Sequence, residues 1–139
     1  MTGTREHLLT DVAALLQELG RTMRAMMTRR LADYGMSPPM VGTLHFLDEP
    51  MAMSALADRL SCDASYVTGL ADRLEERGLV ERLADPSDRR VRQLRLTDKG
   101  LAMRRTLDRH ITEGNPVLER LDDEELADLS TLLRKALDR

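Results

Sequence analysis

Residues 63 to 100 read DASYVTGLADRLEERGLVERLADPSDRRVRQLRLTDKG, and this stretch determines the predicted fold. Asp63 can accept hydrogen bonds from the free amides of a helix start, and Gly78 can end that helix in the left-handed conformation. Apolar and polar residues then alternate on both sides of Asp-Pro-Ser-Asp at 85–88, which is typical of a turn between two strands. The sequence therefore predicts a helix followed by a β-hairpin with a basic second strand.

A shorter helix precedes this one. Ser54 opens the segment SALADRLS, which is long enough for about two helical turns. Only Ser61 and Cys62 separate it from the helix that Asp63 begins, and two helices across so tight a turn are typical of a helix-turn-helix. With the hairpin as a wing, the prediction is a mainly α fold of the winged helix-turn-helix type.

Further helices flank this unit. Residues 7–32 carry a wide apolar stripe, because large apolar residues recur there at steps of three and four. The members of that stripe are Leu8, Val12, Leu15, Leu19, Met23 and Met26, widened by Leu9, Leu16, Met27 and Leu31. Such a stripe exceeds what one small core can bury, which indicates a second chain. Ser37-Pro38-Pro39 predicts the start of a helix to about Asp48.

The C-terminal part begins with a helix that Thr97 caps and that Asn115-Pro116 interrupts. Asp122 and Glu125 then form a capping-box pattern for a last helix. We expect one domain at 1–139, with a winged helix-turn-helix lobe at 36–100 and flanking helices at 1–35 and 101–139.

Composition limits the function classes. The chain has 139 residues, of which 42% are apolar and 32% charged, as in a single globular domain. Cys62 is the only cysteine, which excludes an internal disulfide and a Cys-rich metal site. The sequence has neither a long apolar run nor a signal-peptide pattern, so we expect a cytoplasmic protein without a membrane partner.

The charge is unevenly distributed along the chain. The net charge is −3, yet residues 89–109 hold eight Lys or Arg against two Asp, while residues 110–139 hold four against eight acidic residues. A basic run is typical either of a solvated helix face or of a phosphate-binding surface. Its position in the predicted wing favours the phosphate-binding surface.

The predicted DNA-binding residues lie on the second helix and on the wing. A helix fits the major groove, where its first outward residues reach base edges, while a hairpin tip lies beside the minor groove. The hydroxyls of Ser65, Tyr66 and Thr68 would contact bases or phosphates. Gly69 would allow the helix backbone to approach the DNA closely, and Arg73 would reach a phosphate or a guanine edge. Glycine inside a helix costs about 1 kcal/mol relative to alanine, which favours a role in close approach over tolerated packing. The wing would add the cations Arg89, Arg90 and Arg92, with Arg95 nearby.

At these residues the sequence resembles the MarR family of transcriptional regulators. The resemblance rests on DASYVTGLADRLEERGLVER (63–82) and DPSDRRVRQLRLTDKG (85–100), with the flanking helices in the family order. It implies a recognition helix at 63–77, a wing tip of Arg89 and Arg90, and an ion pair through which Asp88 braces the wing arginine. It also implies a homodimer formed by the first and last helices, a palindromic double-stranded operator, repression, and release by a small aromatic acid or an oxidant.

The resemblance places a sensing pocket between the dimerisation helices and the DNA-binding lobe. The sequence is rich in methionine in that region, at Met23, Met26, Met27, Met36 and Met40. These side chains would either fill gaps in the core or line a site for a small apolar or aromatic ligand, and their oxidation is a third reading. We expect the protein to respond to such a ligand. The alternative is redox sensing through Cys62, which would require an exposed thiol and not one buried in the tight turn.

No other chemistry has a comparable pattern. His7, His45 and His110 lack metal-ligand spacing, and no nucleophile lies near a histidine in sequence. We therefore expect no enzyme activity, no metal and no cofactor. A winged helix that only binds proteins is a second alternative, but such a module would lack a basic wing.

Overall fold

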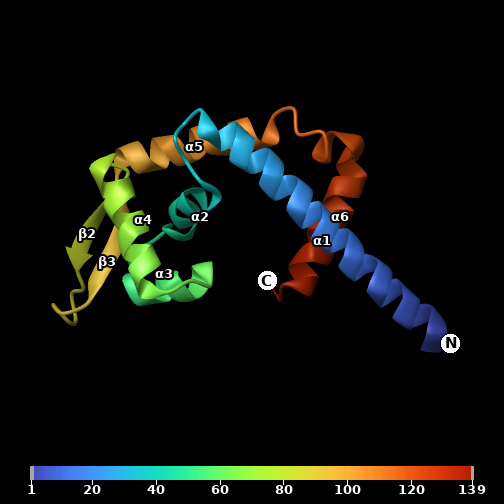
Figure 1. Cartoon of the computed structure of the whole chain (residues 1–139), viewed down its shortest axis with the longest axis horizontal. Helices are drawn as coiled ribbons and strands as arrows, with labels where there is room; N and C mark the ends of the chain where they lie inside the picture. Colours follow the sequence, from blue (N-terminus) through green and yellow to red (C-terminus); the bar gives the residue numbers. More distant parts are fainter. Residues whose placement is uncertain (1, 139) are drawn as a thin grey trace.

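The computed structural model describes residues 2–138 and shows a mainly helical chain with one small sheet (Figure 1). In chain order the elements are α1 (Thr2–Ala32), α2 (Pro38–Phe46), β1 (Met51–Ala52), α3 (Met53–Leu60), α4 (Ala64–Glu76), β2 (Val80–Ala84), β3 (Arg92–Leu96), α5 (Asp98–Thr112), a 3-10 turn (Leu118–Arg120) and α6 (Asp123–Ala136). The fold class predicted from the sequence is confirmed.

The sheet is antiparallel, with the strand order β1-β3-β2. In the hairpin, Val80 lies opposite Leu96 and Ala84 lies opposite Arg92. The third strand, β1, pairs Met51 with Leu94 and was not predicted. Its two residues are too few to show the alternation by which a strand is detected in sequence.

Three helix boundaries differ from the prediction. Helix α1 already begins at Thr2 and not at His7. The periodic pattern did not extend to these residues because none of residues 2–6 has a large apolar side chain. Helix α2 ends at Phe46, short of Asp48. Helix α3 begins at Met53, so Ser54 lies inside its first turn and is not the cap.

Side-chain caps account for the helices that start where predicted. Asp63, Thr97 and Asp122 each accept a hydrogen bond from the backbone N–H three residues later, and the side chain of Glu125 completes a capping box at α6. Ser37 occupies the N-cap position of α2, but its side chain makes no capping bond. One reason is Pro39 at the second helical position, since proline has no N–H to donate.

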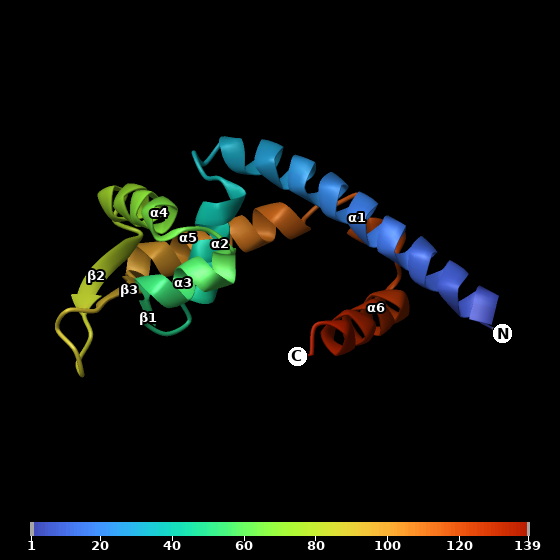
Figure 2. The ribbon, with the colours of Figure 1, turned by 60° about the horizontal axis from the view of Figure 1, so that its bottom comes forward.

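The buried core belongs almost entirely to the part of the chain between α1 and α5. It contains fully buried leucines from α1, α2, α3, α4, β3 and α5, namely Leu31, Leu44, Leu56, Leu70, Leu74, Leu94 and Leu107. Helix α6 has no buried residue, and residues 3–18 of α1 are exposed throughout. Figures 1 and 2 show the consequence: a packed winged helix at one end, with α1 and α6 extending away from it.

Candidate nucleic-acid interface

Helix α4 has one buried and one solvent-exposed face. Its buried face consists of Val67, Leu70, Ala71 and Leu74. The three-residue link from α3 is tight, because Ser61 adopts the left-handed conformation (φ 51°) and the Cys62 N–H donates to the Ala57 carbonyl at 3.1 Å. This turn fixes the direction of α4, which lies with β2 and β3 at the end of the molecule opposite the N-terminus (Figure 1).

The exposed start of α4 is held by Asp63. Its Oδ1 accepts hydrogen bonds from the Tyr66 N–H and the Ser65 hydroxyl, both at 2.9 Å. These bonds, first that of the Tyr66 N–H and then that of Ser65, lower the pKa of Asp63. The carboxylate therefore remains charged at neutral pH, while the Ser65 oxygen still has lone pairs to offer a ligand.

The other predicted α4 residues share this exposed side. Thr68 donates its hydroxyl proton to the Ala64 carbonyl at 3.0 Å, which again leaves oxygen lone pairs free. Tyr66 is 44% exposed, and Arg73 is exposed and forms no ion pair within residues 2–138. A Cβ on Gly69 would meet nothing within 4 Å, so the packing of the protomer does not require glycine at this position.

The wing turn is organised by Asp85. Its Oδ1 accepts hydrogen bonds from the N–H and the hydroxyl of Ser87 and from the N–H of Asp88, while its Oδ2 accepts one from the Gln93 side chain at 2.7 Å. The hydrogen bonds from Ser87, that of the hydroxyl first, lower the pKa of Asp85. The turn between β2 and β3 thus has a defined conformation at neutral pH.

Asp88 does not brace a wing arginine through an ion pair, so that expectation is wrong for this protomer. Its Oδ1 instead accepts a hydrogen bond from the backbone N–H of Arg90 at 2.9 Å. A short aspartate side chain in a turn reaches the amide two residues ahead more easily than the distant end of an arginine side chain. The Arg90 guanidinium consequently has no carboxylate partner among the described residues.

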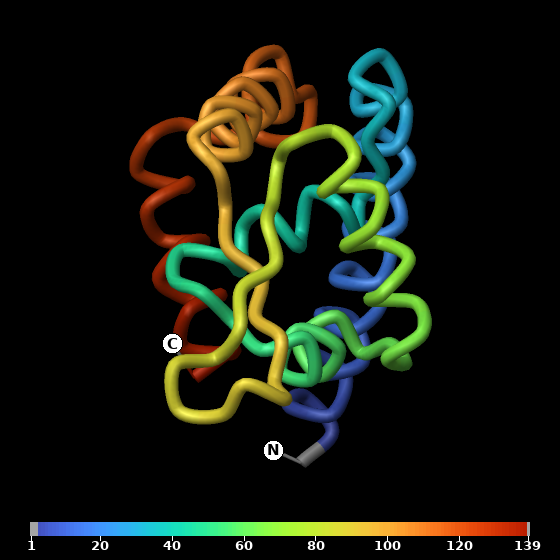
Figure 3. The backbone as a smooth tube through the Cα atoms, turned by 90° about the vertical axis from the view of Figure 1, so that its left-hand side faces the viewer, coloured from blue at the N-terminus to red at the C-terminus, as the bar shows by residue number. Residues whose placement is uncertain are grey.

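The wing carries free positive charge. Arg89, Arg90 and Arg92 are all exposed, and none of them forms an ion pair within residues 2–138. Unpaired guanidinium groups at a hairpin tip are suited to phosphate oxygens. They lie at the same end of the molecule as the exposed start of α4 (Figure 3).

Three further cations of the basic run, Arg95, Lys99 and Arg104, make contacts within the protomer, whereas Arg105 and Arg109 on α5 are exposed and form no ion pair within residues 2–138. Arg95 pairs with Glu81 on the neighbouring strand, and Arg104 pairs with Asp48 at 2.7 Å. Lys99 donates to the Arg77 carbonyl at 2.8 Å. The local charge counted from the sequence therefore overstates the surface available to phosphate, and Arg95 in particular is neutralised.

Sequence reasoning missed Arg82. This residue of β2 reaches across to α4 and pairs with Asp72 at 2.5 Å and with Glu75 at 2.7 Å. The hydrogen bond with Asp72 is the main cause that raises the pKa of Arg82 above its ordinary value. The only indication in the sequence was the spacing of Asp72 and Glu75, three residues apart on one helix, and this spacing did not identify the cation that pairs with them.

A second feature is a largely apolar cavity of about 490 Å³ between α1, α2 and α5. Its lining consists of Gly20, Met23, Arg24, Met27, Pro38, Val41, Gly42, His45, Asp108, Ile111 and Thr112. At its polar end His45 Nε2 lies 2.5 Å from Asp108 Oδ1, and His45 Nδ1 lies 2.8 Å from the Val41 carbonyl oxygen. The cavity thus lies where α2, the first helix of the winged-helix part, packs between the two long helices α1 and α5.

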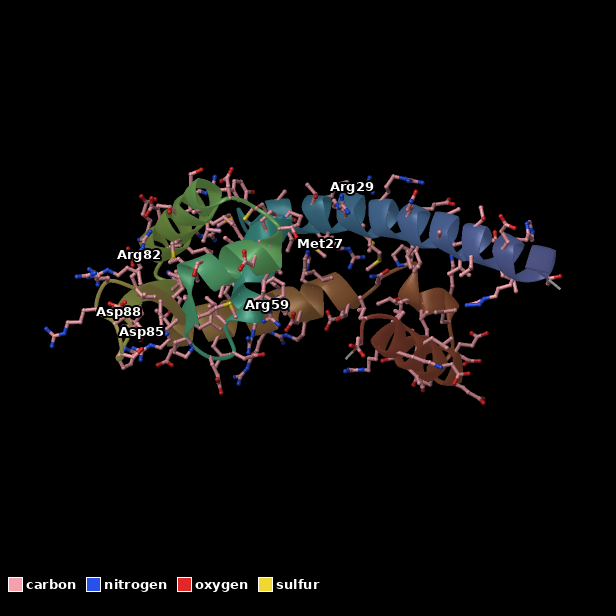
Figure 4. All side chains as sticks on the ribbon, turned by 90° about the horizontal axis from the view of Figure 1, so that it is seen from below. Met27, Arg29, Arg59, Arg82, Asp85 and Asp88 are labelled. Atoms are coloured by element: carbon pink, nitrogen blue, oxygen red, sulfur yellow. The ribbon has the colours of Figure 1, made fainter. Side chains whose placement is uncertain are left out.

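The five methionines of the predicted pocket separate into two groups. Met23 and Met27 line this cavity, and Met27 lies between α1 and α5 in Figure 4. Met26, Met36 and Met40 are buried, at 9%, 5% and 6% exposure, and do not line it. Periodicity in the sequence could not separate the groups, because both are apolar.

Cys62 and the histidines add no further site. The Cys62 thiol is free and half-buried, and it packs against the core. No cluster of three or more metal-ligating side chains occurs in the described part of the chain. No helix within residues 2–138 is long and apolar enough to cross a membrane.

The known proteins that this chain resembles in sequence are helix-turn-helix transcriptional regulators. The family model described as the MarR family matches residues 48–91. The HTH-type transcriptional repressor MdtR of Bacillus subtilis (strain 168) is 33% identical over 97 residues, which cover 68% of this chain and 63% of the relative. The uncharacterized HTH-type transcriptional regulator YsmB of the same organism is 32% identical over 136 residues, which cover 94% of this chain and 86% of the relative.

Solved structures resemble the whole protomer. A MarR family protein from Bacillus stearothermophilus superimposes with a TM-score of 0.79 at 26% identity, covering 96% of this chain and 95% of that chain. CouR from Rhodococcus jostii RHA1, solved with bound p-coumaroyl-CoA, gives a TM-score of 0.73 at 26% identity and covers 91% of each chain.

Proposed function

The chain belongs to the MarR family of winged helix-turn-helix transcriptional regulators, and we propose that it is a homodimeric repressor that a small apolar or aromatic ligand releases from a palindromic operator. DNA binding and transcriptional regulation follow from the family. The operator symmetry, the repression, the ligand and the residues involved are the content of the proposal. A regulator of this kind acts on chromosomal DNA in the cytoplasm.

The main observation in support of the proposal is that the exposed start of α4 and the basic wing lie at the same end of the molecule (Figure 1). The exposed start of α4 offers hydroxyl oxygens, and the wing offers the free guanidinium groups of Arg89, Arg90 and Arg92. In this arrangement α4 would read base edges in the major groove while the wing contacts phosphates beside the minor groove. A wing with this much free positive charge favours DNA over the alternative of a protein-only interaction module.

Exposed apolar residues support the homodimer. On α1 they are Leu8, Leu9, Val12, Leu15 and Leu16, at 48–59% exposure. At the C-terminal end they are Leu132 in α6 and Leu137 at its C-cap, both at 63%. Two apolar helices extending from the packed core would be unfavourable in water unless a second copy covered them. A two-fold dimer would in turn present two recognition helices to two half-sites of a palindrome.

The name of the relative MdtR supports repression, and the cavity supports the ligand. A cavity of about 490 Å³ falls within the range of about 300–1,000 Å³ that is typical of small-molecule sites. The similarity to CouR, solved with p-coumaroyl-CoA, favours an aromatic compound. A ligand can release DNA only if it binds more tightly to the form that does not bind DNA.

The test begins with duplexes selected by the purified dimer from genomic fragments. Arg90→Ala should weaken binding to the selected operator and to random duplex alike, and it should reduce the salt slope by about one unit for each phosphate that is no longer neutralised. Ser65→Ala and Thr68→Ala should instead lower discrimination between the two duplexes, each by about 1–3 kcal/mol. Arg95→Ala is the matched control for the wing because Arg95 is already paired with Glu81. Selection of no duplex by the wild type would refute the proposal.

Redox release through Cys62 is the competing mechanism. Half-burial leaves the thiol partly accessible, but the chain has no second cysteine with which it could form an internal disulfide. Peroxide should therefore release neither the wild type nor Cys62→Ser from the operator. Release of the wild type alone, with no response to any aromatic acid, would show that Cys62 is the sensor.

A further inference from the structure

Arg82 makes the ion pairs that join the wing to the recognition helix. Its guanidinium donates to Asp72 Oδ1 at 2.5 Å and to Glu75 Oε1 at 2.7 Å. Its backbone N–H donates to the other oxygen of Glu75 at 3.2 Å. The side chain of Arg82 is 25% exposed, against 55% for Asp72 and 42% for Glu75. One arginine thus fixes two carboxylates a turn apart on the same helix.

The place of these carboxylates makes the contact relevant to DNA. At about 100° per residue, Asp72 lies on the same side of α4 as Ser65 and Gly69. Arg82 lies on β2, the strand that leads directly into the wing turn, and Figure 4 shows it at the end of the molecule that carries Asp85 and Asp88. The link therefore connects the side of the helix that would read bases with the hairpin that would contact phosphate.

The geometry of the contact favours a defined orientation. A single exposed ion pair contributes little, because solvent and side-chain entropy oppose it. A planar guanidinium shared between two carboxylates is more restricted, since each contact limits the direction of the other. The backbone bond to Glu75 adds a third point of attachment, so rotation of α4 relative to β2 would break several bonds at once.

We propose that Arg82 is a positioning residue for base recognition, which sets the orientation of α4 relative to the wing so that both surfaces engage the duplex in one register. This proposal rests on the function proposed above, because it assumes that α4 and the wing bind DNA. Arg82 itself need not touch a base. Removal of the Arg82 side chain should lower the ratio of the affinity for operator to the affinity for random duplex. A change in the amount of folded protein would leave that ratio unaltered.

The experiment compares affinities for the selected operator and for random duplex, with thermal melting of every variant. Arg82→Ala should reduce the operator-to-random ratio about tenfold, the scale of a single hydrogen-bonded base. Arg82→Lys should recover only part of the ratio, because an ammonium cannot hold both carboxylates in a fixed fork. Arg95→Ala, which removes a strand arginine paired with Glu81 and not with α4, should leave the ratio unchanged.

A triple variant separates orientation from charge. Arg82→Ala with Asp72→Asn and Glu75→Gln removes the link and also the two negative charges that Arg82 had balanced. It should bind random duplex at least as tightly as the wild type while its ratio stays low. Recovery of the ratio would overturn the proposal, because charge neutralisation alone would then explain Arg82. An unchanged ratio in Arg82→Ala would also overturn it.

Glu75→Gln serves if Arg82→Ala fails to fold, since it changes only a half-exposed side chain and leaves the pair with Asp72. It should lower the ratio about threefold, as expected for a weakened link. An unchanged ratio in this folded variant would count against the proposal. If the wild type itself preferred no duplex, the function proposed above would fail, and that result differs from every outcome assigned to Arg82.

Discussion

The winged helix and the α1–α6 arm have similar sequence patterns but opposite burial. Here the winged helix means the elements α2 to β3, from Pro38 to Leu96, and the arm means residues 3–18 of α1 together with α6. Leu70 and Leu74 in α4 are 0% exposed, whereas Leu15 in α1 is 56% exposed and Leu132 in α6 is 63% exposed. Both sets recur at helical spacing. An amphipathic pattern therefore identifies a face that needs a partner, but not whether that partner belongs to the same chain.

The same difference separates the two faces of α4. Its inner face is buried by the core of the protomer, while the outer face has free hydroxyl oxygens and an open position at Gly69. In the proposed complex the partner of that outer face is DNA, and the partner of the arm is a second copy. The following predictions test whether the winged helix is self-sufficient and whether the arm and the α4 surface depend on partners.

The largest effect is expected in the arm. Leu15→Glu places a charge in the middle of the exposed stripe and should convert the dimer into a monomer in sedimentation experiments. Operator affinity should fall by about 10²–10⁴-fold, because two linked recognition helices gain that much over one. Gln17→Glu, on the opposite side of α1, is the matched control and should leave the dimer intact. A dimer that survived Leu15→Glu would place the interface elsewhere.

The core of the winged helix should respond next. Leu70→Ala should lower the free energy of unfolding by about 2–5 kcal/mol, as measured by urea denaturation, because it leaves a cavity in a fully buried site. In the monomeric Leu15→Glu background this destabilisation should persist, whereas Leu132→Ala should have almost no effect there. If the Leu15→Glu chain were unfolded, the winged helix would not be self-sufficient and the comparison would fail.

The cavity joins the two regions and should give an intermediate effect. Met27→Gln introduces a polar group at an apolar wall and should weaken operator release by an active aromatic acid by about 1–3 kcal/mol. Met36→Leu, in the core and away from the cavity lining, should leave release unchanged. Release curves measured over a ligand series would give the shift. Equal responses in both variants would place the ligand outside this cavity.

The smallest effect concerns Gly69. Gly69→Ala should raise the free energy of unfolding by up to about 1 kcal/mol, since the added Cβ meets nothing within 4 Å and alanine favours the helix. Operator affinity should nevertheless fall if the DNA backbone approaches this position. Thermal melting and operator binding measured on the same sample would separate the two effects. Unchanged affinity would show that glycine is merely tolerated at this position.

Local signals in the sequence predicted much of the fold. The caps at Asp63, Thr97 and Asp122 and the left-handed Gly78 (φ 69°) were correctly identified, as was the hairpin turn at 85–88. In each case the interacting groups lie within a few residues of one another, so sequence spacing almost fixes their geometry. The exposed stripe of α1 was also detectable, because it is wider than a small core requires.

Contacts between distant residues were beyond the reach of the sequence. No pattern revealed the contacts of Arg82 with Asp72 and Glu75. Even at short range, the family resemblance implied an Asp88–arginine ion pair, where the structure has a hydrogen bond from the Arg90 backbone N–H to Asp88. The sequence also grouped five methionines of which two line the cavity. A charge or an apolar side chain can have many partners at similar energies, and the choice depends on which elements the fold brings together.

The sequence by itself determined the helices, the helix-turn-helix, the hairpin and the family, because these depend on local hydrogen bonds, helical periodicity and motif spacing. Only the tertiary structure decided which charges are free and which are neutralised. Among residues 2–138, Arg89, Arg90 and Arg92 have no ion-pair partner because the hairpin holds them away from the helices. Arg95 and Arg104, by contrast, contact Glu81 and Asp48 through strand pairing and helix packing. The surface available to DNA is therefore a product of packing, since burial and pairing are properties of the folded chain and not of its order of residues.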